Sequence, residues 1–266
     1  MSGGKGSANL KGENLQKKLF LSLAFVLIIT ALLILVRGVK PGPRIAFVID
    51  DWGYNFKNID LVNEINCPIN ISILPNLRYS RKIAEEFKNN SLHDIMLHLP
   101  LESKSNIAAE LNTIRSSMDK DEILSILRDD LGSIPGVIGV SSHQGSKATE
   151  DKALMSIVLS ELKKRDLFFL DSFTTPNSIC SDLAGKLGVR YTTRDVFLDI
   201  TDKTDLDHFE SYIKKQINEL GDVAIKSGVA VGVGHNIEIT LKAIKYSIPL
   251  LEAKGIKIVP LKELVK

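Results

Sequence analysis

The sequence has little cysteine, no excess charge of either sign and no serine-hydrolase motif. Its 266 residues include only two cysteines, Cys67 and Cys180. Two cysteines are too few for a disulfide framework, and these two lack the spacing of a cysteine metal site. Lys and Arg total 34 against 32 for Asp and Glu. The chain thus lacks the basic field of nucleic-acid-binding proteins, and we expect no nucleic-acid partner. No Gly-x-Ser-x-Gly turn surrounds the serines near His143, which disfavours a serine nucleophile.

One long hydrophobic run lies near the N-terminus. Residues 19–36 (LFLSLAFVLIITALLILV) contain only Ser22 and Thr30 as polar members, and the run is close to the length that a bilayer requires. We predict a transmembrane signal anchor with a cytoplasmic N-terminus, because Lys17 and Lys18 precede the run. A cleaved signal peptide and a buried helix are the alternatives, although no small-residue cleavage site follows the run.

This run divides the chain into four predicted regions. Residues 1–18 are polar and glycine-rich, as is typical of a disordered tail, here on the cytoplasmic side. Residues 19–36 form the anchor, residues 37–43 a short stiff linker, and residues 44–266 one domain of ordinary size. The predicted location is that of a single-pass membrane protein whose domain is periplasmic or otherwise extracytoplasmic.

Short apolar runs alternate with segments of helical periodicity from residue 44 onward. This alternation predicts an α/β fold with a parallel sheet or barrel. The predicted strands are residues 45–49, 69–74, 94–99, 137–141, 167–170, 189–192, 229–233 and 256–259. The predicted helices are residues 79–88, 121–131, 150–164 with Thr149 as N-cap, 207–220 and 238–253. Seven or eight strands favour a closed or nearly closed (β/α) barrel, and an open doubly wound sheet is the alternative.

Ionisable residues follow several of these apolar runs, namely Asp50, Asp51, His98, His143, Asp171, Asp199 and His235. In a (β/α) barrel the carboxyl ends of the strands share one rim, where active sites are built, so we expect segments far apart in the sequence to converge on one cleft. Each residue also has a structural alternative. The aspartates could cap turns or orient neighbours, and the histidines could form ordinary buried hydrogen bonds.

An aspartate with two histidines is a ligand set suited to a divalent metal such as zinc that keeps one position open for water. Such a metal would polarise a carbonyl and lower the pKa of bound water. A second carboxylate without a metal contact could accept the water's proton, and another histidine could protonate the leaving group. The predicted rim supplies one of each.

Six short segments carry a family resemblance. They are AFVIDDWGY at 46–54, LHLPLE at 97–102, GVSSHQGS at 139–146, FLDS at 169–172, VFLD at 196–199 and VGH at 233–235. In this order they resemble the divergent polysaccharide deacetylases of the YibQ type, which are related to the NodB-like carbohydrate esterases. The resemblance covers residues 44–266.

The resemblance implies a distorted barrel of seven or eight β/α units of the NodB type, preceded here by the transmembrane helix. It implies that Asp51, His98 and His143 hold a divalent metal, with Asp50 as general base and His235 as catalytic acid. The two metal-binding histidines come from separate strands, whereas typical deacetylases carry a His-x-x-x-His pair on one segment.

The remaining expected site residues are Asp171, as a further catalytic residue, and Trp52, Ser142 and Asp199, as substrate contacts. The function expected from the resemblance is metal-dependent N-deacetylation of an envelope polysaccharide or peptidoglycan-like glycan, with zinc as the favoured metal. The alternatives are a hydrolase of another envelope amide or ester, and a non-catalytic membrane-anchored envelope protein that binds glycan or a protein partner through the same cleft.

Overall fold

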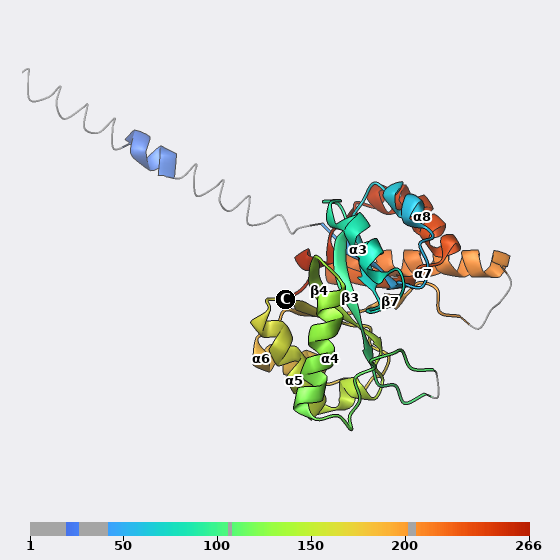
Figure 1. The fold of residues 1–266 in the computed structure, drawn as a ribbon. Helices are drawn as coiled ribbons and strands as arrows, with labels where there is room; N and C mark the ends of the chain where they lie inside the picture. The colour runs from blue at the N-terminus through green and yellow to red at the C-terminus, as the bar shows by residue number, and fades with distance from the viewer. Residues whose placement is uncertain (1–19, 27–41, 106–107, 202–205) are drawn as a thin grey trace, which may run out of the picture. The chain divides into compact units, whose positions relative to one another are not determined.

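The computed structural model describes residues 20–26, 42–105, 108–201 and 206–266 of the chain. The chain divides into two units, residues 1–41 and residues 42–266. The architecture described below is that of the second unit (Figure 1).

Of the predicted anchor, residues 20–26 are helical, and residue 19 and residues 27–36 lie outside the described residues. The predicted tail at 1–18 and residues 37–41 of the predicted linker also lie outside them. Within the described ranges, no helix is both long enough and apolar enough to cross a membrane. The predicted single-pass membrane location, with an extracytoplasmic domain, is therefore contradicted.

The second unit is built around a parallel sheet. Its strands are β1 Arg44–Trp52, β2 Ile69–Ile73, β3 Asp94–Leu101, β4 Val137–Gln144, β5 Phe168–Asp171, β6 Tyr191–Thr193, β7 Val196–Phe197, β8 Val229–His235 and β9 Lys257–Ile258. Their order is β6-β5-β4-β3-β2-β1-β8-β7, with β9 pairing against β1. The central strands β1, β2 and β3 are buried at nearly every position, because both of their faces are covered.

The two ends of this strand order belong to one segment, residues 191–198. The segment pairs with β5 through β6, and the Arg194 amide still bonds to the Asp171 carbonyl at 3.0 Å. One residue later the Asp195 amide bonds to the Val231 carbonyl at 2.9 Å, and β7 then pairs with β8. The sheet is therefore an incompletely closed, distorted barrel. The predicted strands are confirmed, and the two-residue strand β7 was not predicted.

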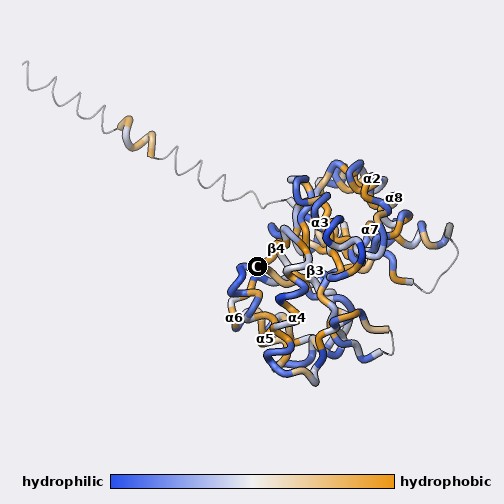
Figure 2. Tube along the Cα trace, in the orientation of Figure 1, coloured by the Kyte–Doolittle hydropathy of each residue, from blue (hydrophilic) through white to orange (hydrophobic). Residues whose placement is uncertain are grey.

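Helices cover the outside of the barrel in two groups (Figure 1). They are α2 Ile59–Asn63, α3 Ser80–Lys88, α4 Lys120–Ser133, α5 Lys152–Lys164, α6 Cys180–Leu187, α7 Leu206–Ser227 and α8 Glu238–Ala253, with short 3₁₀ turns η1 Ala148–Glu150 and η2 Leu261–Glu263. Hydrophobic and hydrophilic residues alternate along them, as expected of helices that bury one face (Figure 2). Neither α2 nor α6 was predicted.

The start of α5 differs from the prediction. Asp151, not Thr149, is the N-cap, and its carboxylate accepts the Ala153 and Leu154 amides at 2.9 and 3.0 Å. The Thr149 hydroxyl instead donates to the Gly145 carbonyl at 2.9 Å. Thr149 therefore belongs to η1 and cannot cap the helix.

Alternate residues of the strands build the barrel interior. A buried cluster there contains Ala46, Val48, Met96, Phe168, Leu170, Val231 and Val233. Because side chains on one face of a strand recur every second residue, the same faces continue to Asp50, His98 and His235 at the carboxyl ends. The interior is thus apolar along most of its length and becomes polar at the rim.

Candidate functional site

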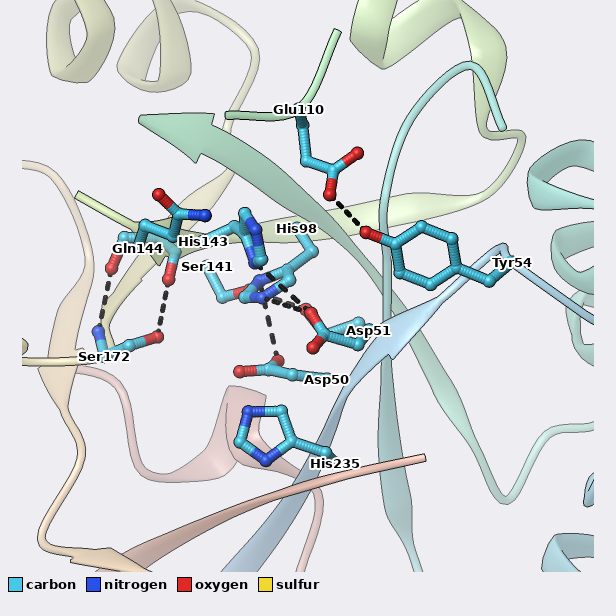
Figure 3. Close-up of polar contacts among 12 residues, drawn as sticks. Asp50, Asp51, Tyr54, His98, Glu110, Ser141, His143, Gln144, Ser172 and His235 are labelled. Carbon is cyan, nitrogen blue, oxygen red and sulfur yellow. Dashed lines mark hydrogen bonds and ion pairs between the residues drawn. The ribbon is translucent and has the colours of Figure 1, made fainter. Parts of the chain in front are cut away.

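A cavity of ≈ 480 Å³ opens at the carboxyl ends of the strands. It is lined by Asp50, Asp51, His98, Ser103, Ser105, Ser142, His143, Gln144, Ser146, Ser172, Thr174, Phe197, Ile200 and His235. Figure 3 shows the polar side chains at its base, which come from β1, β3, β4 and β8. The structure thus brings together the two aspartates and three histidines that the sequence analysis placed on one rim.

The end of β1 presents two successive carboxylates to this cavity. In a regular strand, neighbouring side chains point to opposite faces. Asp51 instead has φ 63°, in the left-handed region, and the pairing of β1 with β2 is irregular between Ile49 and Trp52. Such a conformation costs of order 1–3 kcal/mol for a residue other than glycine. The strained turn allows both Asp50 and Asp51 to line the cavity.

Asp51, His98 and His143 form a compact cluster. The Asp51 Oδ1 atom lies 3.4 Å from His98 Nε2 and 3.2 Å from His143 Nδ1. One ligand atom from each residue lies within 4.8 Å of the others. The histidines come from adjacent strands, where His98 pairs with Ser141 and His143 pairs with Pro100. This register brings two imidazoles from separate strands to the same carboxylate.

The residues of this cluster fit a divalent cation. Asp51 Oδ1 and His143 Nε2 are buried atoms without a hydrogen-bond partner, although two imidazoles approach the carboxylate. A carboxylate oxygen and an imidazole nitrogen without partners, with a second imidazole beside them, form a group that a bound ion would complete, and the donor set suits zinc and similar metals.

The two neighbouring carboxyls have opposite pKa shifts. Burial raises the pKa of Asp50, which is 2% exposed, and His98 and His235 oppose this shift only in part. Burial also acts on Asp51, but the imidazoles of His143 and His98 beside its Oδ1 atom outweigh it and hold the pKa of Asp51 below its usual range. Asp51 therefore favours its anionic form, and Asp50 is better suited to exchange a proton.

His235 lies across the cavity from the cluster and is paired with Asp199. His235 Nδ1 is 2.8 Å from Asp199 Oδ1, and the His235 amide donates to Asp199 Oδ2 at 2.7 Å. Thr240 donates to the same Oδ2 at 2.8 Å. Burial lowers the pKa of His235, but the hydrogen bond and charge of Asp199 outweigh it and raise the pKa to about 9. The imidazole is therefore a protonated donor near neutral pH.

Three predicted site residues lie elsewhere or have other partners. Trp52 has no solvent exposure and packs edge-on against Phe87 in the core, so it is not placed to contact a substrate. Ser142 does line the cavity, where its Oγ accepts the Ser172 amide at 2.9 Å.

Asp171 is buried beside the site and not among the cavity-lining residues. Its oxygens accept the Phe173 amide at 2.8 Å and the Ser178 hydroxyl at 2.5 Å, both from the loop that follows β5. This placement indicates that Asp171 positions the loop, and a direct catalytic role stays a prediction.

The sequence analysis missed several residues around the site. The Phe197 ring stacks on the His235 ring, with the ring centroids 6.3 Å apart. The guanidinium carbon of Arg194 lies 3.7 Å from the centroid of the Phe197 ring. Ser72 lies next to Ser141, with 2.6 Å between their Oγ atoms. A signal for Ser72 was present, because the otherwise apolar strand Ile69–Ile73 carries polar residues at alternate positions.

Comparisons with known proteins agree with this geometry. The family model of the divergent polysaccharide deacetylases matches residues 47–265. The uncharacterized protein YibQ of Escherichia coli K12 is 34% identical over 227 residues, which cover 84% of this chain and 69% of YibQ.

Two solved structures share the fold. The uncharacterized protein ATU2773 of Agrobacterium tumefaciens C58 superposes with a TM-score of 0.77 at 20% identity, covering 86% of this chain and 91% of that one. The Bc1960 peptidoglycan N-acetylglucosamine deacetylase superposes with a TM-score of 0.50 at 15% identity, covering 85% and 89%. Because the family model spans residues 47–265 and YibQ is 34% identical, the chain belongs to the divergent polysaccharide deacetylase family.

Proposed function

We propose that the protein is a metal-dependent hydrolase that removes acetyl groups from the amide nitrogens of a glycan. The observation that carries this proposal is the cluster of Asp51, His98 and His143, with the unligated carboxyl of Asp50 beside it and the Asp199–His235 pair opposite. Each role that amide hydrolysis requires has a side chain at the same cavity.

Asp51, His98 and His143 would hold the cation. When bound, a divalent cation such as zinc supplies positive charge that polarises an acetyl carbonyl and acidifies water. Asp50 accepts the proton of the attacking water, because its burial raises its pKa and makes it a stronger base than an exposed aspartate. The oxygen of that water forms the new bond to the acetyl carbon.

His235 completes the reaction at the leaving nitrogen. Nδ1 is held by Asp199, so Nε2 is the atom that can donate a proton into the cavity. The carbon–nitrogen bond breaks as this proton is transferred, which releases acetate and a free amine. Asp199 keeps the ring charged and oriented during the transfer.

The glycan part of the proposal is supported by the cavity wall and by the fold. Hydroxyl and amide side chains of Ser103, Ser146, Gln144 and Thr174 surround the cluster and suit a polar, uncharged substrate. The deacetylase that shares the fold acts on peptidoglycan N-acetylglucosamine according to its name, and we extend that substrate class to this chain.

The test combines metal content with acetate release from acetylated glycans, using the full chain. We expect near-stoichiometric zinc or a similar ion in the wild-type protein and its loss, together with turnover, in His98→Ala and His143→Ala. Asp50→Asn should keep the metal but lower turnover by about 10²–10⁴-fold, as expected for loss of a general base. A wild-type protein that binds no divalent metal when supplied with it would contradict the proposal and leave glycan binding without turnover as the function.

A further inference from the structure

A phenylalanine is exposed at the edge of the cavity. Phe173 lies in the loop that follows β5, and it is 41% exposed. Its two neighbours in the sequence, Ser172 and Thr174, both line the cavity. Within the described part of the chain, Phe173 belongs to neither hydrophobic cluster of the barrel. Its apolar surface in water costs free energy that a contact at the cavity edge would recover.

The backbone of Phe173 is held in a conformation that a large side chain rarely adopts. Its φ is 51°, in the left-handed region, where a bulky residue is an outlier. The Asp171 carboxylate accepts the Phe173 amide at 2.8 Å, and the Arg194 guanidinium donates to the Phe173 carbonyl at 2.9 Å. Asp171 has no solvent exposure, and Arg194 also donates to the Ser172 carbonyl at 2.7 Å. Two polar side chains thus fix a strained residue that stays partly in solvent.

The turn itself does not require an aromatic side chain. Glycine adopts the left-handed conformation without the steric cost that a Cβ imposes, so glycine at position 173 would satisfy the backbone equally well. Strained residues of this kind cluster at active sites and ligand clamps. The Phe173 ring is therefore explained by a contact with a ligand.

The cavity wall beside Phe173 indicates the chemistry of this ligand. Apart from the two aspartates and three histidines at the base, the described residues that line the cavity carry no charge. Ser172 and Thr174 present hydroxyl groups, and Gln144 presents an amide. A pyranose sugar has hydroxyl groups around its edge and C–H groups on its faces. Hydroxyl and amide side chains suit the edge, and the electron-rich face of an aromatic ring suits the C–H groups.

We propose that Phe173 is a binding platform for the sugar unit next to the one that is deacetylated. This inference rests on the proposed function and specifies its substrate as a chain of at least two sugar units. The acetylated unit occupies the cavity above the cluster of Asp51, His98 and His143, and the neighbouring unit covers the Phe173 ring. Affinity therefore increases when a second sugar unit is present.

The experiment compares the binding of N-acetylglucosamine with that of its β-1,4-linked tetrasaccharide, in titrations followed by NMR. The full chain is kept free of metal by a chelator, so that neither sugar is turned over. The variants are Phe173→Ala, Phe173→Gly and Phe173→Tyr. Tyr246→Ala is the matched control, because that aromatic residue is 65% exposed on α8, on the outside of the barrel. Circular dichroism and Tm show whether each variant is folded.

We expect the wild-type protein and Tyr246→Ala to bind the tetrasaccharide more tightly than the monosaccharide. In Phe173→Ala and Phe173→Gly, affinity for the tetrasaccharide should fall by about 10-fold, the order expected for loss of one aromatic contact. Phe173→Tyr, which keeps the ring, should retain this affinity. Because glycine relieves the left-handed backbone, Phe173→Gly should unfold at a higher temperature than Phe173→Ala. Equal losses of affinity at different stabilities would come from the ring and not from the fold.

Two sets of results separate this inference from the proposed function. An unchanged tetrasaccharide affinity in folded Phe173→Ala or Phe173→Gly, or wild-type protein that does not prefer the tetrasaccharide, would overturn the inference and leave the proposed hydrolase standing. Acetate release is measured in parallel after zinc is restored. Tetrasaccharide binding that depends on Phe173, without acetate release, would instead overturn the proposed hydrolase and leave the sugar platform standing.

Discussion

The Asp199–His235 pair determines the pH range over which the site has a proton to donate. With its pKa raised to about 9, His235 is protonated up to that pH, and the rate should fall as pH rises through it. In Asp199→Asn the hydrogen bond to the ring loses its charge, so the pKa of His235 should return toward its usual value near 6.5. We expect the alkaline limb of the kcat/KM profile to move down by roughly two pH units.

Asp195→Asn is the control for this shift, because Asp195 Oδ2 accepts the Val231 amide at 2.7 Å on the same edge of the barrel. Its alkaline limb should match that of the wild-type protein. The same pKa shift also stabilises the fold. That contribution is complete below pH 6.5 and is lost as pH rises through about 9, since the folded state holds the proton more tightly. An alkaline limb that does not move in Asp199→Asn would remove His235 from the acid role.

Residue types and spacing predicted the rim residues because strand ends are easy to locate in this sequence. Asp50, Asp51, His98 and His143 each end or follow a predicted apolar strand, and a parallel barrel brings such positions together. The left-handed backbone at Asp51 was not predictable, because it is imposed by the irregular pairing with β2. Trp52 was misplaced for the same reason, since the turn at Asp51 returns its side chain to the core.

The close approach of β4 and β5 depends on a glycine. A Cβ on Gly139 would overlap the ring of Phe168, which is fully buried in the barrel interior. Gly139→Ala should therefore destabilise the protein by about 1–3 kcal/mol, the usual cost of overpacking a core. Gly132 in α4 is the matched control, because a Cβ there meets nothing within 4 Å. Gly132→Ala should be stabilising by about 0.5–1 kcal/mol. Chemical denaturation measures both, and equal effects would contradict this account of the packing.

Helices with strong periodicity were located from the sequence, although the one predicted at 207–220 continues to Ser227 in α7, and short or irregular elements were not located. The helix predicted at 238–253 has the observed bounds of α8, whose end at Ala253 is followed by Gly255 in the left-handed region. The strand β7 has only two residues and is a strand only because it pairs with β8. The local sequence does not specify this long-range contact. The cap of α5 was misassigned because Thr149 and Asp151 are both good capping residues.

The site is assembled from segments that lie far apart in the sequence. The local sequence predicts each segment separately but not the contacts between them. His235 and Asp199 are 36 residues apart and meet because β8 pairs with the segment that crosses from β6 to β7. The crossing joins the two ends of the strand order at this point and places Phe197 against the His235 ring, with Arg194 packed on Phe197. Sequence reasoning found the residues of the pair but not their contact, because it did not find β7.

A buried carboxyl, Asp130 on α4, joins the helix to two loops at the same end of the molecule. Asn76 donates to its Oδ1 at 2.7 Å, and Asn112, in the loop that connects β3 to α4, is close enough to lower its pKa. Asp130 has no solvent exposure, and its Oδ2 atom has no hydrogen-bond partner. Burial raises the pKa of Asp130 to about 7, although Asn112 and Asn76 lower this pKa in part. The fold therefore prefers the protonated carboxyl.

This preference makes the stability of the whole molecule depend on pH. As pH rises from about 4 to about 7, the unfolded chain loses the Asp130 proton and the folded protein keeps it, so the contribution of Asp130 to the stability of the wild-type protein falls over this interval. Asp130→Asn retains an oxygen for Asn76 and does not ionise. We expect its Tm relative to the wild-type protein to increase between pH 4 and pH 7 and to stay constant above pH 7. The exposed Asp222→Asn, on α7, should show no such trend. A constant Tm difference across this range would mean that Asp130 is ionised in the folded protein, and that the two asparagines compensate its burial completely.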